Sequence, residues 1–310
     1  MTATAPPSKS APPPPAELTH DVAIDGDALS MIDRQWLITN GTGAYAMGTL
    51  PGINTNRYHG LFIAATAPPV GRVMVLNQTF EQLLIGDQVI EWGGHEFVNE
   101  QGGVCHAPQG HRDLVAFRRG LSCQWVYQNG PIRLTRTLHL HWKKQAATIE
   151  YVLDGVQTDA TLKIHPFLTL RDYHALTTPE AGPIDITPAD DTIRARRGDL
   201  VATLACSGTT FEIGGKWWFG VKYRIDADRG QTDTEDLFVP GAFVAPVPGG
   251  KKLKLALTVA LGEAPAGKPA SRKKHINTIA GSVTAEDEDE KVRTALAIAS
   301  DDFVVDRTVS

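Results

Sequence analysis

The chain has 310 residues, of which 42% are hydrophobic, so it is long enough to bury one large core or two smaller ones. Its formal net charge of -5 argues against a broad basic surface and hence against nucleic acid as a partner. The three cysteines lie far apart with no C-x-x-C pair, which disfavours a zinc site or a disulfide framework and is typical of small apolar residues in strands. They are Cys105, Cys123 and Cys206.

Residues 1–17 are rich in Pro, Ala and Ser, and this composition predicts a disordered or polyproline-like tail. No apolar segment follows a basic start, so the sequence does not indicate a signal peptide. No later apolar run approaches the roughly 20 residues that a membrane helix needs. We therefore expect a cytoplasmic protein without a membrane partner.

From Trp36 to about Leu261 the sequence has the pattern of strands. Apolar and polar residues alternate over residues 132–142, the period-two signature of a sheet with one buried face, and Asn129-Gly130 just before predicts a hairpin turn. No long helices alternate with these strands. The sequence therefore predicts an all-β fold, a large antiparallel, supersandwich-like β-sandwich over residues 18–263. Further strands are predicted at 147–153, 200–206, 211–223 and 253–261, with turns at Gly214-Gly215 and Gly249-Gly250.

The end of the chain changes period. A linker containing Pro, Gly and Lys is predicted over residues 264–283, and one amphipathic helix over residues 284–305. Thr284 and Asp287 form a candidate capping box for this helix. Such a helix either packs on its own sandwich or leads into a further domain. The apolar residues that recur at helical spacing are Val292, Leu296, Ala299 and Phe303.

The segment 36–60 is the most informative part of the chain. Its glycines and small residues impose tight backbone geometry, while its polar side chains offer hydrogen bonds suited to a polyhydroxylated ligand. Gly41 to Ala46 fits the pattern G-x-G-x-x-A, but Gly48, Pro51 and Gly52 leave no room for the helix that a nucleotide site requires. The candidate binding residues are Asn40, Tyr45, Asn54, Asn56, Arg57, Tyr58 and His59.

Two further segments follow in the chain: R-D-Y-H-A at 171–175, and 217–241, which ends in E-D-L-F-V-P-G. With the opening segment they make most of the chain resemble the N-terminal domain of bacterial and archaeal glycogen debranching enzymes of the amylo-α-1,6-glucosidase type. The chain departs from that pattern at Ala44, where a second glycine is usual, and at Asn56-Arg57, where a basic pair is usual.

The resemblance implies a non-catalytic N-terminal domain, because in that family a following helical barrel carries the catalytic acid and base. The domain would shape substrate access and support an α-1,6-glucosidase barrel, in cis or in trans, that acts on branched α-glucan such as glycogen or limit dextrin. We expect this chain alone to be inactive and to use no cofactor. Its barrel-contact surface would be exposed and would promote self-association. The resemblance adds Arg171, Asp172, Tyr173 and His174 to the residues that face substrate or barrel.

The residues themselves indicate no catalytic pair or metal site. Glycoside hydrolysis normally needs two carboxyl groups across the scissile bond. We expect Asp172 instead to pair with Arg171 and hold a loop, and Glu235-Asp236 to cap the turn before Pro240. Further acidic candidates are Glu81, Glu91 and Glu96.

Histidines and aromatic residues leave more than one interpretation. His139, His141 and His165 lack accompanying carboxylates, so solvated strand histidines are favoured over a metal site. Trp217 and Trp218 must face opposite sides of a strand, so we expect one in the core and the other exposed to sugar. The loop tyrosines either bind ligand or act as buried anchors.

Two other functions remain open. A self-sufficient, mutarotase-like sugar epimerase also uses a large β-sandwich, with His and Glu moving protons. A purely structural docking module would never touch sugar.

Overall fold

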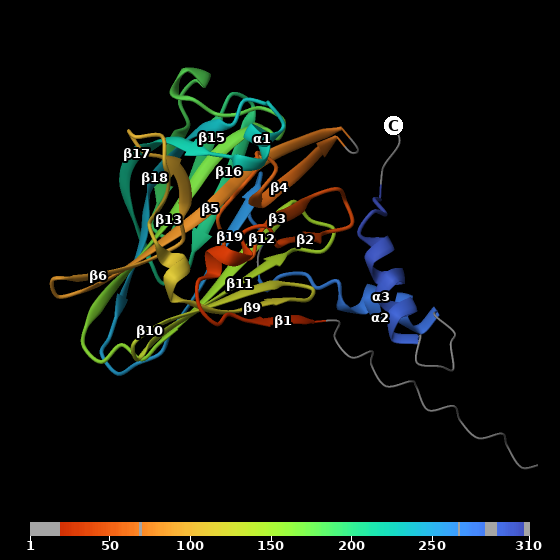
Figure 1. The fold of residues 1–310 in the computed structure, drawn as a ribbon, viewed down its shortest axis with the longest axis horizontal. Coiled ribbons are helices and arrows are strands. Elements are labelled where there is room, and N and C mark those ends of the chain that lie inside the picture. The colour runs from red at the N-terminus through yellow and green to blue at the C-terminus, as the bar shows by residue number, and fades with distance from the viewer. Residues whose placement is uncertain (1–18, 68–69, 266, 283–289, 307–310) are drawn as a thin grey trace, which may run out of the picture.

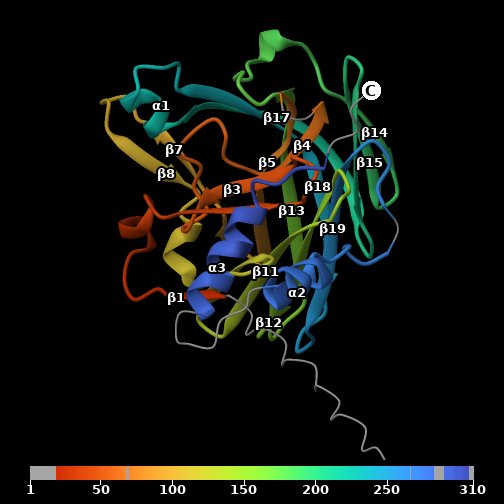
Figure 2. The ribbon, with the colours of Figure 1, turned by 90° about the vertical axis from the view of Figure 1, so that its right-hand side faces the viewer.

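The computed structural model describes residues 19–67, 70–265, 267–282 and 290–306. Strands make up most of the chain between His20 and Leu261, in two antiparallel sheets stacked face to face (Figure 1). Two helices near the C-terminus lie together at one end of the sandwich (Figure 2). The predicted all-β sandwich with a C-terminal helix is confirmed. The predicted tail, residues 1–17, lies outside the described residues.

The first sheet has nine strands, in the order β1-β9-β10-β11-β12-β19-β16-β15-β14. Every pairing within it is antiparallel. Its strands are β1 (His20–Ala23), β9 (Leu114–Arg119), β10 (Cys123–Asn129), β11 (Ile132–Leu140), β12 (Ala146–Asp154), β14 (Asp185–Ala189), β15 (Thr192–Arg197), β16 (Leu200–Cys206) and β19 (Leu253–Leu261).

The second sheet has ten strands, in the order β2-β3-β4-β5-β13-β18-β17-β7-β8, with β6 paired to β5. It carries all three segments of the family resemblance. Its strands are β2 (Gln35–Thr39), β3 (Tyr45–Thr49), β4 (Gly60–Ala67), β5 (Gly71–Ile85), β6 (Gln88–Trp92), β7 (His95–Val98), β8 (Val104–Ala107), β13 (Ala160–Asp172), β17 (Thr210–Lys222) and β18 (Thr234–Val247).

The alternation on β11 shows why these residues form strands. Ile132, Leu134 and Leu138 are buried and lie in the core between the sheets, and Asn129-Gly130 makes the predicted turn from β10. Arg136 occupies the same inward face and is buried as well. Its guanidinium lies 4.7 Å from the Trp125 ring centroid and 3.5 Å from the Glu81 carboxylate, so a charge pair stabilises this position inside the sandwich.

A second, smaller apolar cluster covers the other face of the second sheet. Phe80, Phe167, Tyr223 and Val239 are buried there, with Trp218 packed partly against them. Because side chains alternate along a strand, the residues of β5 and β13 that point away from the main core meet in this cluster.

Two sequence predictions about this sheet need correction. Gly214-Gly215 is no turn, because β17 runs through it and the pairing with β18 shifts register between Ile213 and Lys216. Two glycines mark this bulge, a feature that sequence alone does not separate from a turn. Trp217 and Trp218 do face different neighbours, but both are half-buried.

The C-terminal region is more helical than predicted. Helix α2 (Lys273–Ser282) lies inside the range expected to be a linker, and α3 (Glu290–Asp301) ends before residue 305. Thr284 and Asp287, the expected capping pair, lie outside the described residues. The shorter helices are α1 (Arg224–Asp228), η1 (Ala28–Met31), η2 (Gly110–Asp113) and η3 (Pro179–Ala181). No helix among the described residues is long and apolar enough to cross a membrane.

Ion pairs hold the two C-terminal helices to each other and to the sandwich. Arg272 pairs with Asp301 and Asp302, and His275 Nε2 lies 2.9 Å from the Asp301 carboxylate. Asp302 also accepts a 2.9 Å hydrogen bond from Thr39 of β2. The residues that anchor α3 are therefore polar.

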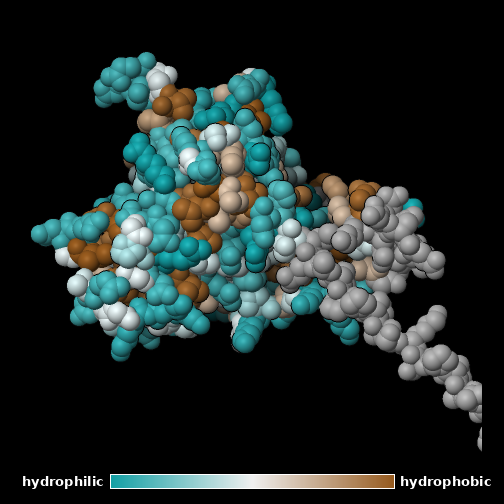
Figure 3. Space-filling view, turned by 60° about the horizontal axis from the view of Figure 1, so that its bottom comes forward, coloured by the Kyte–Doolittle hydropathy of each residue, from teal (hydrophilic) through white to brown (hydrophobic). Residues whose placement is uncertain are grey.

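Apolar side chains at the helical end are exposed. Val292, Leu296 and Phe303 are 57%, 63% and 83% exposed. These side chains form what we call the apolar stripe of α3, with Phe303 just beyond the end of the helix. Apolar side chains are visible at the helical end of the molecule and in separate patches elsewhere (Figure 3).

Candidate functional site

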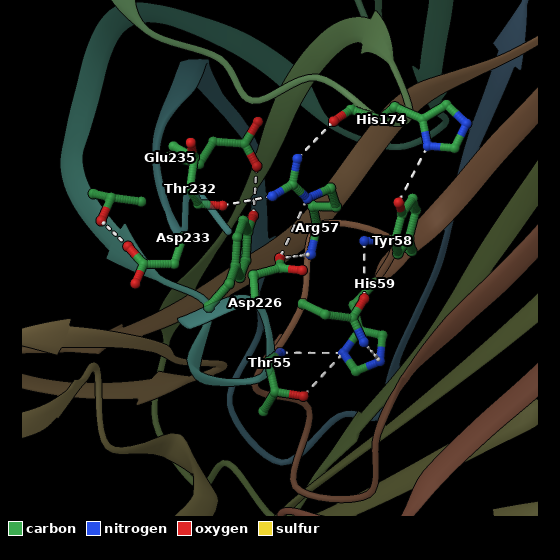
Figure 4. A network of polar contacts seen from close by, with 12 residues as sticks. Thr55, Arg57, Tyr58, His59, His174, Asp226, Thr232, Asp233 and Glu235 are labelled. Atoms are coloured by element: carbon green, nitrogen blue, oxygen red, sulfur yellow. Dashed lines mark hydrogen bonds and ion pairs between the residues drawn. The ribbon is translucent and has the colours of Figure 1, made fainter. Parts of the chain in front are cut away.

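The three sequence segments meet at one end of the second sheet. The turn after Asn54 lies beside the end of β13 and beside the segment that includes α1 and the start of β18 (Figure 4). Strand order explains this meeting, because β4, β5, β13 and β18 are consecutive neighbours in the sheet. The candidate residues fall into two groups, a buried polar network and a half-exposed aromatic cluster.

Arg171 and Glu235 form the centre of the buried network. Arg171 Nε lies 2.6 Å from Glu235 Oε1, and Nη2 lies 3.1 Å from Oε2. Nη1 donates to the carbonyls of Asp172 and Tyr173, and Nη2 donates to that of Arg57. All five guanidinium N–H groups thus have partners. Burial alone would lower the pKa of Arg171, but the Glu235 carboxylate together with Tyr223 and Tyr45 outweighs burial, and the pKa is raised.

Glu235 is saturated with hydrogen bonds. Besides Arg171, its carboxylate accepts hydrogen bonds from the Tyr223 hydroxyl and from the Thr177 backbone N–H at 2.9 Å. Burial and this carboxylate raise the pKa of Tyr223 well above its usual value. The expectation that Glu235 caps a turn is wrong, because the side chain is buried and joins β18 to β13. With no free oxygen at a surface, Glu235 is unsuited to proton transfer to a ligand.

Arg57 ties three segments together. Its Nη1 donates to the His174 carbonyl at 2.9 Å and its Nη2 to the Thr232 carbonyl at 2.6 Å. Its backbone N–H donates to Asp226 Oδ2 at 2.8 Å, and Asp226 is fully buried (Figure 4). Both ends of the guanidinium fork are thus occupied by main-chain carbonyls, which is the arrangement of a tie between loops.

Three other candidate residues are buried and bind protein groups. Asn40 donates to the Lys144 carbonyl at 2.7 Å, and Asn54 contacts the Asn77 side chain at 2.9 Å. His59 Nδ1 accepts the Thr55 backbone N–H at 3.1 Å, which places the proton of the neutral ring on Nε2. Burial lowers the pKa of His59 to about 3. These side chains fix the shape of the opening segment from inside.

Asn56 is buried as well, with its side chain 2.9 Å from His59 Nε2. Four further candidates, Tyr45, Tyr58, Tyr173 and His174, form with Arg72 what we call the aromatic cluster. The Tyr58 ring lies 5.7 Å from that of Tyr173, and its hydroxyl lies 3.1 Å from His174 Nδ1. Arg72 lies over Tyr45 and Tyr173, with its guanidinium carbon 5.9 and 5.5 Å from the two ring centroids. Burial raises the pKa of Tyr45.

The aromatic cluster borders solvent. Tyr45, Tyr58, Tyr173 and Arg72 are half-buried, and His174 is exposed. Next to it a cavity of about 290 Å³ lies between the β2-β3 hairpin and the chain that follows α3, with Tyr45, Arg72 and Phe303 among its lining residues. The cluster therefore combines ring faces with a cation beside a hollow.

Asp172 was expected to pair with Arg171, but its Oδ1 accepts the His174 backbone N–H at 2.8 Å instead. It does hold the loop, as predicted, through the backbone and not through its arginine neighbour. Within Asp172, the Arg171 guanidinium contacts the main-chain carbonyl and not the carboxylate. Sequence reasoning missed Arg72, because nothing in its sequence surroundings marks it.

The other acidic candidates are also committed to protein partners. Glu96 accepts from Arg224 and lies 3.2 Å from His106 Nε2, and Asp236 accepts the Gly220 backbone N–H. Gln82 donates to Glu91 at 2.8 Å. None of these contacts places two carboxyl groups across an open cleft.

The candidate histidines are separated in the described structure. His141 is buried and bonded to Thr148 Oγ1 at 2.8 Å, so the expectation of a solvated histidine is wrong there. His139 lies 3.3 Å from Glu150, and His165 contacts Gln82 at 3.0 Å. The described residues contain no group of three or more His, Cys, Asp or Glu side chains that could hold a metal ion.

The fold and these residues define a β-sandwich domain with a polar network under an aromatic surface. A model of the family described as glycogen debranching enzyme N terminal matches residues 34–254. The chain belongs to this family. It is thus related to the N-terminal domains of glycoside hydrolases. No curated protein sequence matches the chain.

Solved structures give weak likenesses. A putative kojibiose phosphorylase from the human microbiome is 8% identical, with a TM-score of 0.41 over 91% of this chain and 38% of that one. A bacterial glucoamylase complexed with acarbose is 11% identical, with a TM-score of 0.38 over 92% and 37%. The chain therefore spans less than two fifths of these two proteins.

A putative aldose 1-epimerase from Klebsiella pneumoniae subsp. pneumoniae is 9% identical, with a TM-score of 0.34 over 94% of this chain and 98% of that one. At these TM-scores the likenesses carry no argument about the activity of this chain.

Proposed function

We propose that the chain is the non-catalytic N-terminal domain of a glycogen debranching enzyme. It supports a helical catalytic domain, in cis or in trans, and shapes the approach of branched α-glucan to it. Family membership supplies the enzyme class. The observation that carries the proposal is the exposed apolar stripe of α3, because a stripe of this kind on a surface helix is normally covered by a packing partner.

A groove continues this stripe onto the sandwich. It has a volume of about 630 Å³ and lies between α3 and strands β1, β2 and β9. Its apolar lining includes Trp36, Leu50 and Phe117 from the sandwich, together with Ala299 and Phe303 from the helical end. Stripe and groove form one apolar surface, and this supports a catalytic domain that packs there.

The aromatic cluster supplies the part of the proposal that concerns substrate. Tyr58, Tyr173 and His174 present ring faces and hydroxyl or imidazole atoms to solvent, and such groups suit the apolar faces and hydroxyls of a sugar ring. The buried network beneath them fixes the loops that carry them. In this proposal Arg57 and Arg171 stabilise the loops without touching sugar, and the cluster guides glucan toward the catalytic domain.

The epimerase alternative has less support. An epimerase needs a histidine and a carboxylate with free atoms in one hollow. His165 and Glu212 do line one hollow on the second sheet. However, Glu212 lies 2.6 Å from Lys163 Nζ, and the His165 imidazole is bonded to Gln82. Both groups are thus paired with other side chains in this arrangement.

The test is a comparison of hydrolysis rates. We expect the chain alone to release no glucose from limit dextrin and to show no mutarotation of glucose. Adding it to a separately produced helical catalytic domain of the same family should raise the debranching rate of that domain. Turnover by the chain alone, abolished by Asp172→Asn or Glu235→Gln, would overturn the proposed division of roles.

A further inference from the structure

The outer face of the second sheet contains a hollow that the proposed function does not use. It has a volume of about 360 Å³, within the range of about 300–1,000 Å³ for small-molecule sites. It spans β5, β13, β18 and β17, which are consecutive neighbours in the sheet. A hollow on four hydrogen-bonded strands is held rigidly.

The floor of the hollow is aromatic. The Phe80 and His165 rings stack at 5.2 Å with an interplanar angle of 23°, and the Trp218 ring lies 5.7 Å from Phe80. Burial, aided by Lys163, lowers the pKa of His165 to about 4, so the ring is neutral near pH 7. Aromatic faces pack well against the apolar face of a sugar ring, and His165 and Trp218 are half-buried here.

The rim of the hollow is polar and of mixed charge. The Lys163–Glu212 pair lies at one edge, exposed Lys216 belongs to the same strand as Glu212, and Gln82 bonds His165. These groups offer both donors and acceptors, which suits hydroxyl groups better than an anion or an acidic peptide.

Glycines shape the strands that line the hollow. A Cβ at Gly241 would lie 2.0 Å from the Glu212 carbonyl oxygen, so only glycine allows β18 and β17 to approach as they do. Gly214, at the β17 bulge, likewise puts no side chain over the hollow. Bulges of this kind are common next to binding sites.

From these features we propose that the hollow is a second glucan site, which holds an α-1,4-linked glucan chain away from the aromatic cluster. The choice of α-glucan as the ligand rests on the proposed function. The site would keep a branched polymer attached to the domain while another part of it reaches the catalytic domain, and this raises the local concentration of substrate.

Binding of maltoheptaose to the full chain, measured by calorimetry and tryptophan fluorescence, tests the proposal. We expect Trp218→Ala to weaken binding about tenfold, the effect of losing one aromatic contact. Lys216→Ala, at an exposed position that does not endanger folding, should weaken it about threefold. Trp217→Ala is the matched control, because Trp217 is half-buried on the same strand but packs on Phe238.

The outcomes separate this proposal from the proposed function. No binding of maltoheptaose by the folded chain would overturn the second site, while the effect on debranching by a catalytic domain would still decide the proposed function. Binding that survives Trp218→Ala and Lys216→Ala but is lost in Tyr173→Ala would also overturn it. Equal losses in Trp217→Ala and Trp218→Ala would mean that the hollow itself is not the site.

Discussion

The buried polar network of the sandwich and the helical end both contain arginine–carboxylate pairs, but the two regions differ in burial. Arg171 is buried, has a partner for every donor and faces a carboxylate that is also saturated. Arg272 pairs with Asp301 and Asp302 nearer the surface, and the apolar side chains of the α3 stripe are exposed. The region around Arg171 buries its apolar side chains and pairs its buried charges with hydrogen-bonding partners. The helical end instead fixes its position with charges and leaves its apolar stripe uncovered.

The largest expected effect is the loss of the buried pair. Arg171→Ala leaves Glu235 buried without its cation, so we expect the free energy of unfolding to fall by about 3–5 kcal/mol. Urea denaturation measures this. The control is Arg194→Ala, which breaks an exposed pair with Glu263 and should cost less than about 1 kcal/mol. Similar costs for the two variants would contradict the distinction between the regions.

As the pH falls, the sandwich should lose stability before the helical end does. Burial lowers the pKa values of His59 and His95 to about 3, while the unfolded chain titrates them near 6.5. Their contribution to stability is therefore complete above pH 6.5 and is lost as the pH falls toward 3, by roughly 2 kcal/mol for each histidine between pH 7 and pH 5. Urea denaturation at the two pH values tests this.

A histidine variant and a local probe sharpen the pH test. His59→Gln should remove roughly 2 kcal/mol of the loss between pH 7 and pH 5, the share of one buried histidine, and His139→Gln, at a half-exposed site, is the control. At the helical end burial raises the pKa of Asp301, but hydrogen bonds from His275 and Arg272 outweigh this and lower it. We therefore expect amide protons of α3 to keep their local protection at pH 5. The comparison would be contradicted if the amide protons of α3 lost this protection at a pH where the free energy of global unfolding is still unchanged.

A substitution at Arg57 tests whether this residue belongs to the buried polar network or to the surface that contacts sugar. Arg57→Ala removes two hydrogen bonds to carbonyls and exposes the buried Asp226 carboxylate, so we expect a loss of about 1.5–3 kcal/mol in stability. Debranching per folded molecule, measured with a catalytic domain, should stay near normal. A tenfold lower rate with an unchanged melting temperature would instead place Arg57 in contact with sugar or with the catalytic domain.

The smallest effect on stability is expected at the helical end. Leu296→Glu changes an exposed side chain, so the free energy of unfolding should change by less than about 0.5 kcal/mol. Binding to the catalytic domain, measured by size-exclusion chromatography or calorimetry, should nevertheless be lost. Val89→Glu is the matched control, since Val89 is 50% exposed on β6 and lies away from this end. Unimpaired binding by Leu296→Glu would show that the stripe is not the interface.

Local sequence patterns predicted much of the sandwich. The alternation on β11, the Asn129-Gly130 turn and the glycines at 249–250 act over a few residues, and the structure confirms all three. The helix at 290–301 follows from its apolar spacing for the same reason. The Gly214-Gly215 prediction was wrong because a bulge and a turn place the same demand on the backbone and differ only in what the next strand pairs with.

The sequence by itself determined the fold class, most strand positions and the family to which the chain belongs, because periodicity and motifs are properties of neighbouring residues. Only the tertiary structure decided what the motif residues do. Arg171 finds Glu235 rather than Asp172, and Arg57 finds the carbonyls of His174 and Thr232. These partners are brought together by strand order, and strand order depends on long-range packing that no local pattern encodes. The same holds for α3, whose apolar spacing predicts a stripe but not that the stripe is exposed.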